Sequence, residues 1–289
     1  MHGQDVVNWI FLAGFYASVA VGFSLVWGIM NIVNLAHGAL ILVGAYVALV
    51  LYQQFHVDPF LSIPLAMAVL FVIGWVVQYV AINRVIRAPF LVTFMLTFGL
   101  DLLIVDLIQQ HFGGDVQSIS TSYAGAGVDL GSTHVAYDRI GATAIAITLT
   151  AGLSLFLSRT RTGNAILATG MDRDAARLMG ISIRHIYALT FGIGAALAGA
   201  AGAMLAEVQS FTPTLGGSFT LRAFVIVVLG GLGTPMAALA GGLLFGLVET
   251  VVPLIPNVGA GYEDAIAFAV LVLVLTVRPN GLLGKQFYS

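Results

Sequence analysis

The chain has 289 residues, of which 59% are hydrophobic and 8% are charged, and its net charge is −2. A soluble domain carries about 25% charged residues, so this composition excludes a water-soluble globule. The near-neutral charge gives no basis for nucleic acid binding. With no cysteine, disulfides and Cys-based metal sites are also excluded.

Long apolar runs point to the membrane. Between Val6 and Asn83 the only charged residue is Asp58. A membrane helix needs roughly 20 apolar residues, so this stretch alone has room for three. Segments such as Ala265–Val277 lack the alternation of a β-barrel strand. We therefore expect an all-α, polytopic transmembrane bundle that forms one domain over residues 1–289.

Nine segments are candidate spans, with ends uncertain by several residues. In chain order they are Trp9–Met30, Ala36–Gln53, Phe60–Ile82, Phe90–Gln109, Arg139–Leu157, Ile186–Glu207, Phe219–Leu232, Ala237–Pro253 and Asp264–Val277. The first lacks the positive flank of a cleavable signal and is expected to be retained. Phe219–Leu232 is short and could be re-entrant, which leaves eight spans as an alternative.

Basic residues predict the orientation, because short cytoplasmic loops are rich in Lys and Arg. Most of the basic residues fall in three places: Arg84 and Arg87; Arg159, Arg161, Arg173, Arg177 and Arg184; and Arg278 with Lys285. Nine spans would place all three on one side of the membrane, which we take as the cytoplasmic side. The N-terminus and the polar loop 110–137 would then be periplasmic, and the C-terminus cytoplasmic.

Two apolar runs are interrupted by helix breakers. One interruption covers Gly28–Gly38, and the other covers Gly230–Pro235. The predicted break residues are Gly38, Gly230, Gly231, Gly233 and Pro235. Transporters place substrate near broken helices, although a plain tight loop would give the same pattern. Small residues every fourth position, as at Gly194, Ala198 and Gly202, predict close helix packing or, alternatively, a helix that lines a path.

Polar residues inside the spans are candidates for a translocation path, because burying them in lipid is costly. The candidates are Asn31, Asn34, His37, Thr97, Asp101 and Glu249. Glu249 is the deepest acid and the strongest single candidate. His37 is better interpreted as a hydrogen-bonded structural residue than as a titrating one. Arg222 is expected near a membrane boundary.

The loop 158–185 predicts a short amphipathic helix on the cytoplasmic side. Its apolar residues recur at helical spacing: Ile166, Leu167, Met171, Ala175, Leu178 and Met179. Charged residues mark the other face, and Gly180 stands where a helix would be capped. Helices that lie on lipid are usually strongly basic with bulky apolar residues. Because this one has balanced charge and no aromatic residue, we expect it to dock a soluble protein.

This loop resembles a known coupling element. The segment Asp174–Gly180 (DAARLMG) is similar to the EAA-x-x-x-G loop of ABC importer permeases, with Asp in place of Glu. The Ile-x-Leu-Pro that follows in the general motif is absent, which favours the branched-chain amino acid permease family. Three further segments resemble that family, in particular its shorter Liv-type subunit: Gly28–Ala39, Val228–Pro235 and Arg278–Gly284. Urea permeases of ABC importers share these motifs.

The resemblance implies an assembly of several subunits. A second, longer permease would complete the path, two ATPases would bind the loops, and a periplasmic binding protein would deliver substrate. The implied coupling residues are Met171, Arg173, Asp174, Ala175, Ala176, Arg177 and Gly180. The chain has no Gly-x-x-x-x-Gly-Lys-Ser/Thr phosphate loop, so ATP and Mg²⁺ would be bound by the partner ATPases. We expect no catalytic residue, metal or cofactor in this chain.

Other classes of function stay open at this point. A secondary transporter or channel would work without ATPases, but the sequence has no convincing internal repeat and the loop would lack a purpose. A membrane enzyme would need a nucleophile–base pair or a metal cluster, and no such motif is present. A purely structural subunit is a further alternative. The cargo could be a branched-chain or other amino acid, a short amide or urea.

Overall fold

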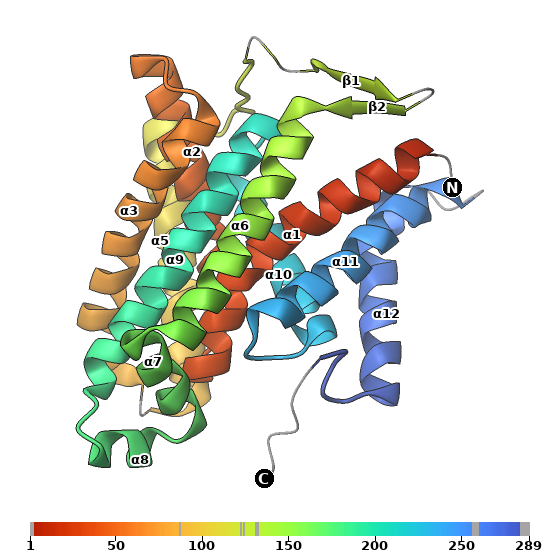
Figure 1. Cartoon of the computed structure of the whole chain (residues 1–289). Coiled ribbons are helices and arrows are strands. Elements are labelled where there is room, and N and C mark those ends of the chain that lie inside the picture. Colours follow the sequence, from red (N-terminus) through yellow and green to blue (C-terminus); the bar gives the residue numbers. More distant parts are fainter. Residues whose placement is uncertain are drawn as a thin grey trace.

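The computed structural model describes residues 3–86, 88–121, 123, 125–130, 133–255 and 260–283 as a bundle of long helices (Figure 1). Within these residues, eight helical segments are long and apolar enough to cross a membrane. The predicted all-α membrane bundle is therefore confirmed.

The elements follow one another in a simple order. The helices are α1 Gly3–Met30, α2 His37–Phe55, α3 Pro59–Val77, α4 Asn83–Val85, α5 Phe90–Phe112, α6 Tyr137–Arg159, α7 Arg161–Met171, α8 Arg173–Leu178, α9 Ile183–Val208, α10 Gly216–Gly230, α11 Pro235–Val251 and α12 Glu263–Val277. A π-helical turn, Gln78–Ile82, joins α3 to α4. Strands β1 Gly127–Leu130 and β2 Thr133–Ala136 pair antiparallel.

The late spans differ in detail from the prediction. Helix α10 begins at Gly216, and the 3₁₀ turn Pro213–Leu215 extends it to an 18-residue apolar segment. Helix α12 forms where a ninth span is expected but has only 15 residues. At about 1.5 Å per residue it is shorter than the roughly 30 Å hydrocarbon layer. Among the described residues, eight helical segments are thus long enough to cross the membrane, and α12, at the position of the ninth predicted span, is shorter.

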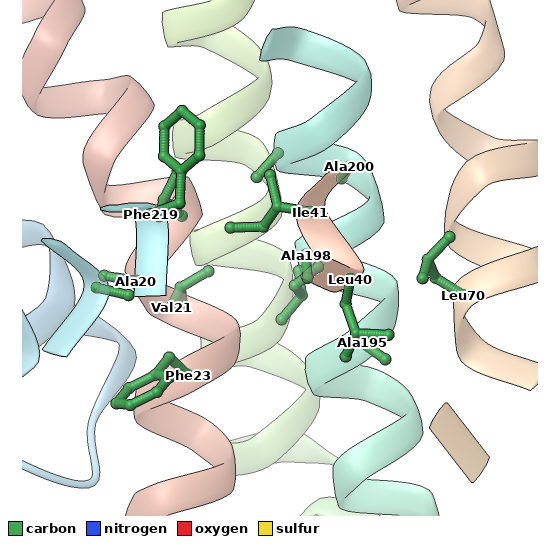
Figure 2. Packing of buried hydrophobic residues seen from close by; sticks show 14 of the residues in the cluster. Ala20, Val21, Phe23, Leu40, Ile41, Leu70, Ala195, Ala198, Ala200 and Phe219 are labelled. Atoms are coloured by element: carbon green, nitrogen blue, oxygen red, sulfur yellow. The ribbon is translucent and has the colours of Figure 1, made fainter. Parts of the chain in front are cut away.

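Helices α1 and α9 form the centre of the bundle. In their apolar windows 83% and 89% of the residues are buried, against 17% for α5 at the periphery. A Cβ atom added at Gly202 of α9 would lie 1.8 Å from the carbonyl oxygen of Ile41 in α2. The small residues of α9 therefore let the backbones touch, as predicted. Figure 2 shows this core, built from side chains of α1, α2, α3, α9 and α10.

The two ends of the bundle carry different elements (Figure 1). At one end the first turn of α1 meets the hairpin, where Gln4 Oε1 accepts a hydrogen bond from the His134 amide at 2.9 Å. Helices α7 and α8 lie at the other end. Asn83 Nδ2 donates to the Arg184 carbonyl at 3.3 Å, which brings the loop after α3 to that same end.

The three regions rich in basic residues, around Arg84, in the loop 158–185 and at Arg278, lie at one end of the bundle. This agrees with the arrangement predicted from nine spans. Gly281 packs against Gly231, and Gly233 packs against Gly28, next to α7. Residues 278–283, the described part of the chain after α12, therefore lie at the end that holds α8, opposite the first turn of α1. Arg87 and Lys285 lie outside the described residues.

Two hydrogen bonds join the predicted polar loop 110–137 to the start of α3 and the end of α9. Tyr123 Oη donates to Asp58 Oδ2 at 2.5 Å, and Thr121 Oγ1 donates to Glu207 Oε1 at 2.7 Å. Burial and the hydrogen bond to Asp58 raise the pKa of Tyr123 above its ordinary value. The hairpin of β1 and β2 was not predicted, and it lies within this loop.

Candidate functional site

The predicted amphipathic helix is two helices. Asp172 ends α7, and its Oδ1 accepts hydrogen bonds from the amides of Asp174 and Ala175, both at 2.9 Å. An Asp that caps the next helix in this way competes with continuation of the preceding one. The prediction of one continuous helix was therefore wrong, although both predicted ends of the segment are helical.

Helix α8 exposes nearly all of its side chains. Among the residues predicted for coupling, Ala176 is buried, whereas Met171, Arg173, Asp174, Ala175, Arg177 and Gly180 are exposed. Met171, Leu178 and Met179 are 82%, 89% and 83% exposed. We call these three residues the α8 patch. Large apolar side chains grouped on a surface are typical of a protein contact.

Gly180 closes α8 with a backbone that disfavours other residues. Its φ is +84°, and the amides of Gly180 and Ile181 donate to the carbonyls of Arg177 and Ala176 at 3.0 and 3.1 Å. This is the Schellman pattern of a helix end, so the predicted cap is confirmed. No atom lies within 4 Å of a Cβ added at Gly180, so a side chain would strain the backbone without clashing.

A cleft of about 290 Å³ lies beside α8. Arg173, Asp174 and Arg177 line one wall, and Ile183 and Tyr187 of α9 line the other. The cleft has charged and apolar walls, and it continues the exposed surface of α8. A partner that covers the α8 patch could insert a side chain here.

Helix α7 connects this surface to the membrane spans. A Cβ atom at Gly170 of α7 would lie 2.8 Å from Ile29 Cδ1 and 3.3 Å from Ile29 Cα, so α7 packs directly on the end of α1. A Cβ atom at Gly28 would lie 2.3 Å from the Cα of Gly233. The two interruptions predicted separately in the sequence are therefore in contact, and α7 touches one of them.

The second interruption agrees with its predicted residues. Helix α10 ends at Gly230, Gly231 and Gly233 have φ of +104° and +88°, and Pro235 is the first residue of α11. The segment after α12 completes it: the amides of Leu282 and Leu283 donate to the carbonyls of Leu229 and Gly230, both at 2.9 Å. These bonds satisfy two of the free carbonyls that end a helix. Gly284, which ends this motif, lies outside the described residues.

The first interruption is shorter than predicted. Helix α1 ends at Met30, Asn31 has a φ of +54°, and α2 already begins at His37. Gly38, predicted as a break residue, lies inside α2. Its role is a close approach, because a Cβ atom there would lie 1.8 Å from the Gly216 carbonyl oxygen. That contact brings the start of α2 against the start of α10.

Two threonines from neighbouring helices bind the irregular backbone of 31–36. Thr97 Oγ1 of α5 accepts from the Leu35 amide at 3.3 Å, and its one hydrogen can go either to the Phe94 carbonyl of its own helix at 3.0 Å or to the Val33 carbonyl at 3.4 Å. Thr220 Oγ1 of α10 donates to the Leu35 carbonyl at 3.1 Å and accepts from the Gly38 amide at 2.8 Å. Thr220 was not predicted, because its hydrogen-bond partner, the Leu35 carbonyl, lies 185 residues earlier in the chain.

Two of the remaining candidates, His37 and Asn34, also have hydrogen-bond partners in the protein. The His37 imidazole Nε2 donates to the Val19 carbonyl at 2.8 Å, in keeping with the structural interpretation of this residue. Asn34 Oδ1 accepts from the Ala36 amide at 3.1 Å. Asn31 is exposed. Asp101, one turn beyond Thr97, has a buried Oδ1 without a hydrogen-bond partner among the described residues. A place on a transport path stays a prediction for all of them.

Glu249 belongs to a cluster of charges between four helices, which we call the charge cluster: Tyr16, Arg222, Glu249 and Asp264. Arg222 Nη1 lies 3.1 Å from Glu249 Oε1, and its Nε lies 3.1 Å from Asp264 Oδ1. Tyr16 Oη donates to Glu249 at 2.8 Å and accepts from Arg222 at 2.6 Å. Arg222 lies between these helices with a side chain that is 23% exposed, and its position near a membrane boundary stays a prediction.

Broken spans, charges buried between helices and an exposed helix pair at one end together define a polytopic membrane permease. The sequence agrees with this assignment. Residues 6–275 match the family described as branched-chain amino acid transport system / permease component, and the chain belongs to that family.

Relatives match over nearly the whole chain. It is 31% identical to the high-affinity branched-chain amino acid transport system permease protein BraD of Pseudomonas aeruginosa, covering 98% of this chain and 95% of that protein. It is 29% identical to the permease protein LivH of Escherichia coli K12, with the same coverage. It is 27% identical to LivM of that organism, over 98% of this chain and 71% of LivM. No solved structure matches the chain.

Proposed function

We propose that this chain is the shorter of two permease subunits in an ATP-driven importer of branched-chain amino acids. The relatives named above carry this cargo in their names, which does not favour urea or short amides. The partners would be a second permease resembling LivM, two ATPases that hold ATP and Mg²⁺, and a substrate-binding protein. The membrane would be the bacterial inner membrane.

The observation that carries the proposal is the α8 patch and its connection inward. Three apolar side chains are 82% or more exposed at one end of a membrane protein. Helix α7, directly before α8, packs on Ile29 and Gly28, where the two interruptions meet. An ATPase bound to α8 could therefore move α7 against the end of α1 and shift both interruptions. A secondary transporter would have no use for this surface.

This proposal gives each end of the bundle a side. The end with α7 and α8 faces the cytoplasm, and the end with the hairpin and the first turn of α1 faces the periplasm. The chain lacks cysteine, so single cysteines report the side directly. A cysteine at Leu178 should react only with reagent on the ATPase side. A cysteine at Val116, which is 67% exposed in the other loop, should react only from the opposite side.

Docking is tested by co-purification with the ATPase. Leu178→Glu places a charge in the α8 patch and should remove the ATPase from the purified complex, while the matched control Val116→Glu should keep it. Gly180→Val should lower uptake strongly, because Val does not tolerate positive φ, whereas Gly180→Asn should retain it. An ATPase that stays bound to Leu178→Glu, together with wild-type uptake by Gly180→Val, would refute docking at α8.

A further inference from the structure

A cavity of about 330 Å³ lies at the end of the bundle opposite α7 and α8. It is a half-open cavity lined by the first turns of α1, the start of α6 and the residues that end α11. Polar walls come from Asp5, Asn8, Arg139 and Glu249, and apolar walls include Phe11 and Leu254. Its volume falls at the lower end of the range for small-molecule sites.

Arg139 and Glu249, two of the three charged residues that line this cavity, are held in place by the protein. The Arg139 guanidinium donates to Asn8 Oδ1 and lies over the ring of Phe11, 5.2 Å from its centroid. Glu249 is fixed by Tyr16 and Arg222, and its side chain is 8% exposed. A guanidinium has five N–H donors, more than the bond to Asn8 uses. The cavity thus presents a preorganised cation and a preorganised anion.

The charge cluster behind Glu249 carries an excess of negative charge. Arg222 is paired with two carboxylates, those of Glu249 and Asp264. When both are ionised, the cluster has a net charge of −1; Asp264 is 53% exposed, whereas Glu249, the carboxylate that lines the cavity, is only 8% exposed. An ammonium group that entered the cavity beside Glu249 would balance it. A neutral cargo such as urea would bring no such compensation.

We propose that this cavity is an entry subsite for zwitterionic amino acids, in which Arg139 binds the carboxylate and Glu249 binds the ammonium group. Phe11 and Leu254 give the cargo's apolar side chain a surface to contact. The inference rests on the proposed function, since it takes amino acids as the cargo. It adds the position of the site and the chemistry of recognition.

The direct test is ligand binding to the assembled complex of permeases and ATPases without the binding protein. The unfolding midpoint of the complex would be measured at increasing concentrations of each of three ligands, and its rise gives the affinity. The ligands are leucine, leucinamide, which lacks the carboxylate, and 4-methylpentanoate, which lacks the ammonium group. We expect leucine to bind about tenfold more tightly than either analogue, since each loses one charge-assisted contact. Equal affinity for all three, or no binding of leucine, would overturn the proposal.

Variants assign the two contacts. Glu249→Gln and Arg139→Gln should each weaken leucine binding about tenfold, as removal of a charged partner does. The matched controls Glu263→Gln and Asp138→Asn, which change neighbouring charges outside the cavity, should bind leucine as the wild type does. Glu249→Asp should retain part of the affinity, which separates a charge effect from misfolding. Wild-type leucine affinity in both Gln variants would also overturn the proposal.

Uptake by the complete importer separates this inference from the proposed function. If leucine is imported normally while the complex binds leucine and its analogues equally, the subsite is wrong and the function stands. If ATP drives no leucine uptake at all, the proposed function itself fails.

Discussion

Two polar regions inside the bundle are stabilised by different chemistry. At residues 31–36 the irregular backbone is bound by the neutral hydroxyls of Thr97 and Thr220. In the charge cluster, ion pairs and a tyrosine join four helices. The first region satisfies backbone groups that lipid would leave unpaired. The second concentrates charge beside the cavity that we propose as an entry subsite. Polar residues in the spans therefore have at least two separate roles.

The backbone contact at Gly38, beside the first region, should be the least tolerant of substitution. In Gly38→Val, the new Cβ would lie 1.8 Å from the Gly216 carbonyl oxygen, so α2 and α10 must separate. We expect a loss of more than about 3 kcal/mol in the free energy of unfolding, the upper part of the range for overpacked sites. Unfolding in detergent measures it. Gly217→Val is the matched control, because no atom lies within 4 Å of a Cβ there. Similar losses in both variants would contradict this account.

Arg222→Met tests whether the second region depends on paired charge. The variant leaves Glu249 buried without its cation, and we expect a cost of about 3 kcal/mol, the low end for a buried pair, since Arg222 is 23% exposed. The double variant Arg222→Met, Glu249→Leu should recover at least half of that loss. A double variant as unstable as the single one would show that packing, and not charge, holds α10 to α11.

Thr220→Val should have the smallest effect on stability. It removes the hydroxyl that serves the Leu35 carbonyl and the Gly38 amide, at a cost of about 1 kcal/mol for each net hydrogen bond lost. Thr97→Val should cost less, because its bonds at 3.3 and 3.4 Å are longer. Denaturant unfolding of the two variants side by side gives the order. The reverse order would mean that α5, and not α10, fixes the interruption.

Much of the fold could be predicted because membrane helices are specified locally. Apolar length predicts the spans, and Gly and Pro mark the interruption at 231–235. Small residues of α9 predicted its close packing. The break at Asp172 was missed because the apolar spacing continues across it, although an Asp at a helix start is a recognised cap signal. The hairpin was missed because its strands are only four residues long.

The candidate site depends on contacts that a single sequence does not contain. Gly28 and Gly233 each signalled an interruption, but their contact requires the packing of α1 against the turn before α11. Glu249 was singled out as a buried acid, while Arg222 was placed near a boundary. Arg222 can pair with Glu249 only if the face of α10 that carries Arg222 packs against α11. Apolar residues occur on several faces of α10, so the sequence does not show which face packs there. Thr220 was hidden for the same reason.

The central claim is that motion of α8 reaches the interrupted spans through α7. Gly170→Val tests it most directly, because the added side chain pushes α7 away from Ile29 and leaves the residues of the α8 patch themselves unchanged. The measurement is leucine imported per ATP hydrolysed in the reconstituted importer, with Gly99→Val, which has no atom within 4 Å of its Cβ, as the control. We predict that Gly170→Val keeps ATP hydrolysis and loses about tenfold in imported leucine per ATP. An unchanged ratio in Gly170→Val would contradict the claim.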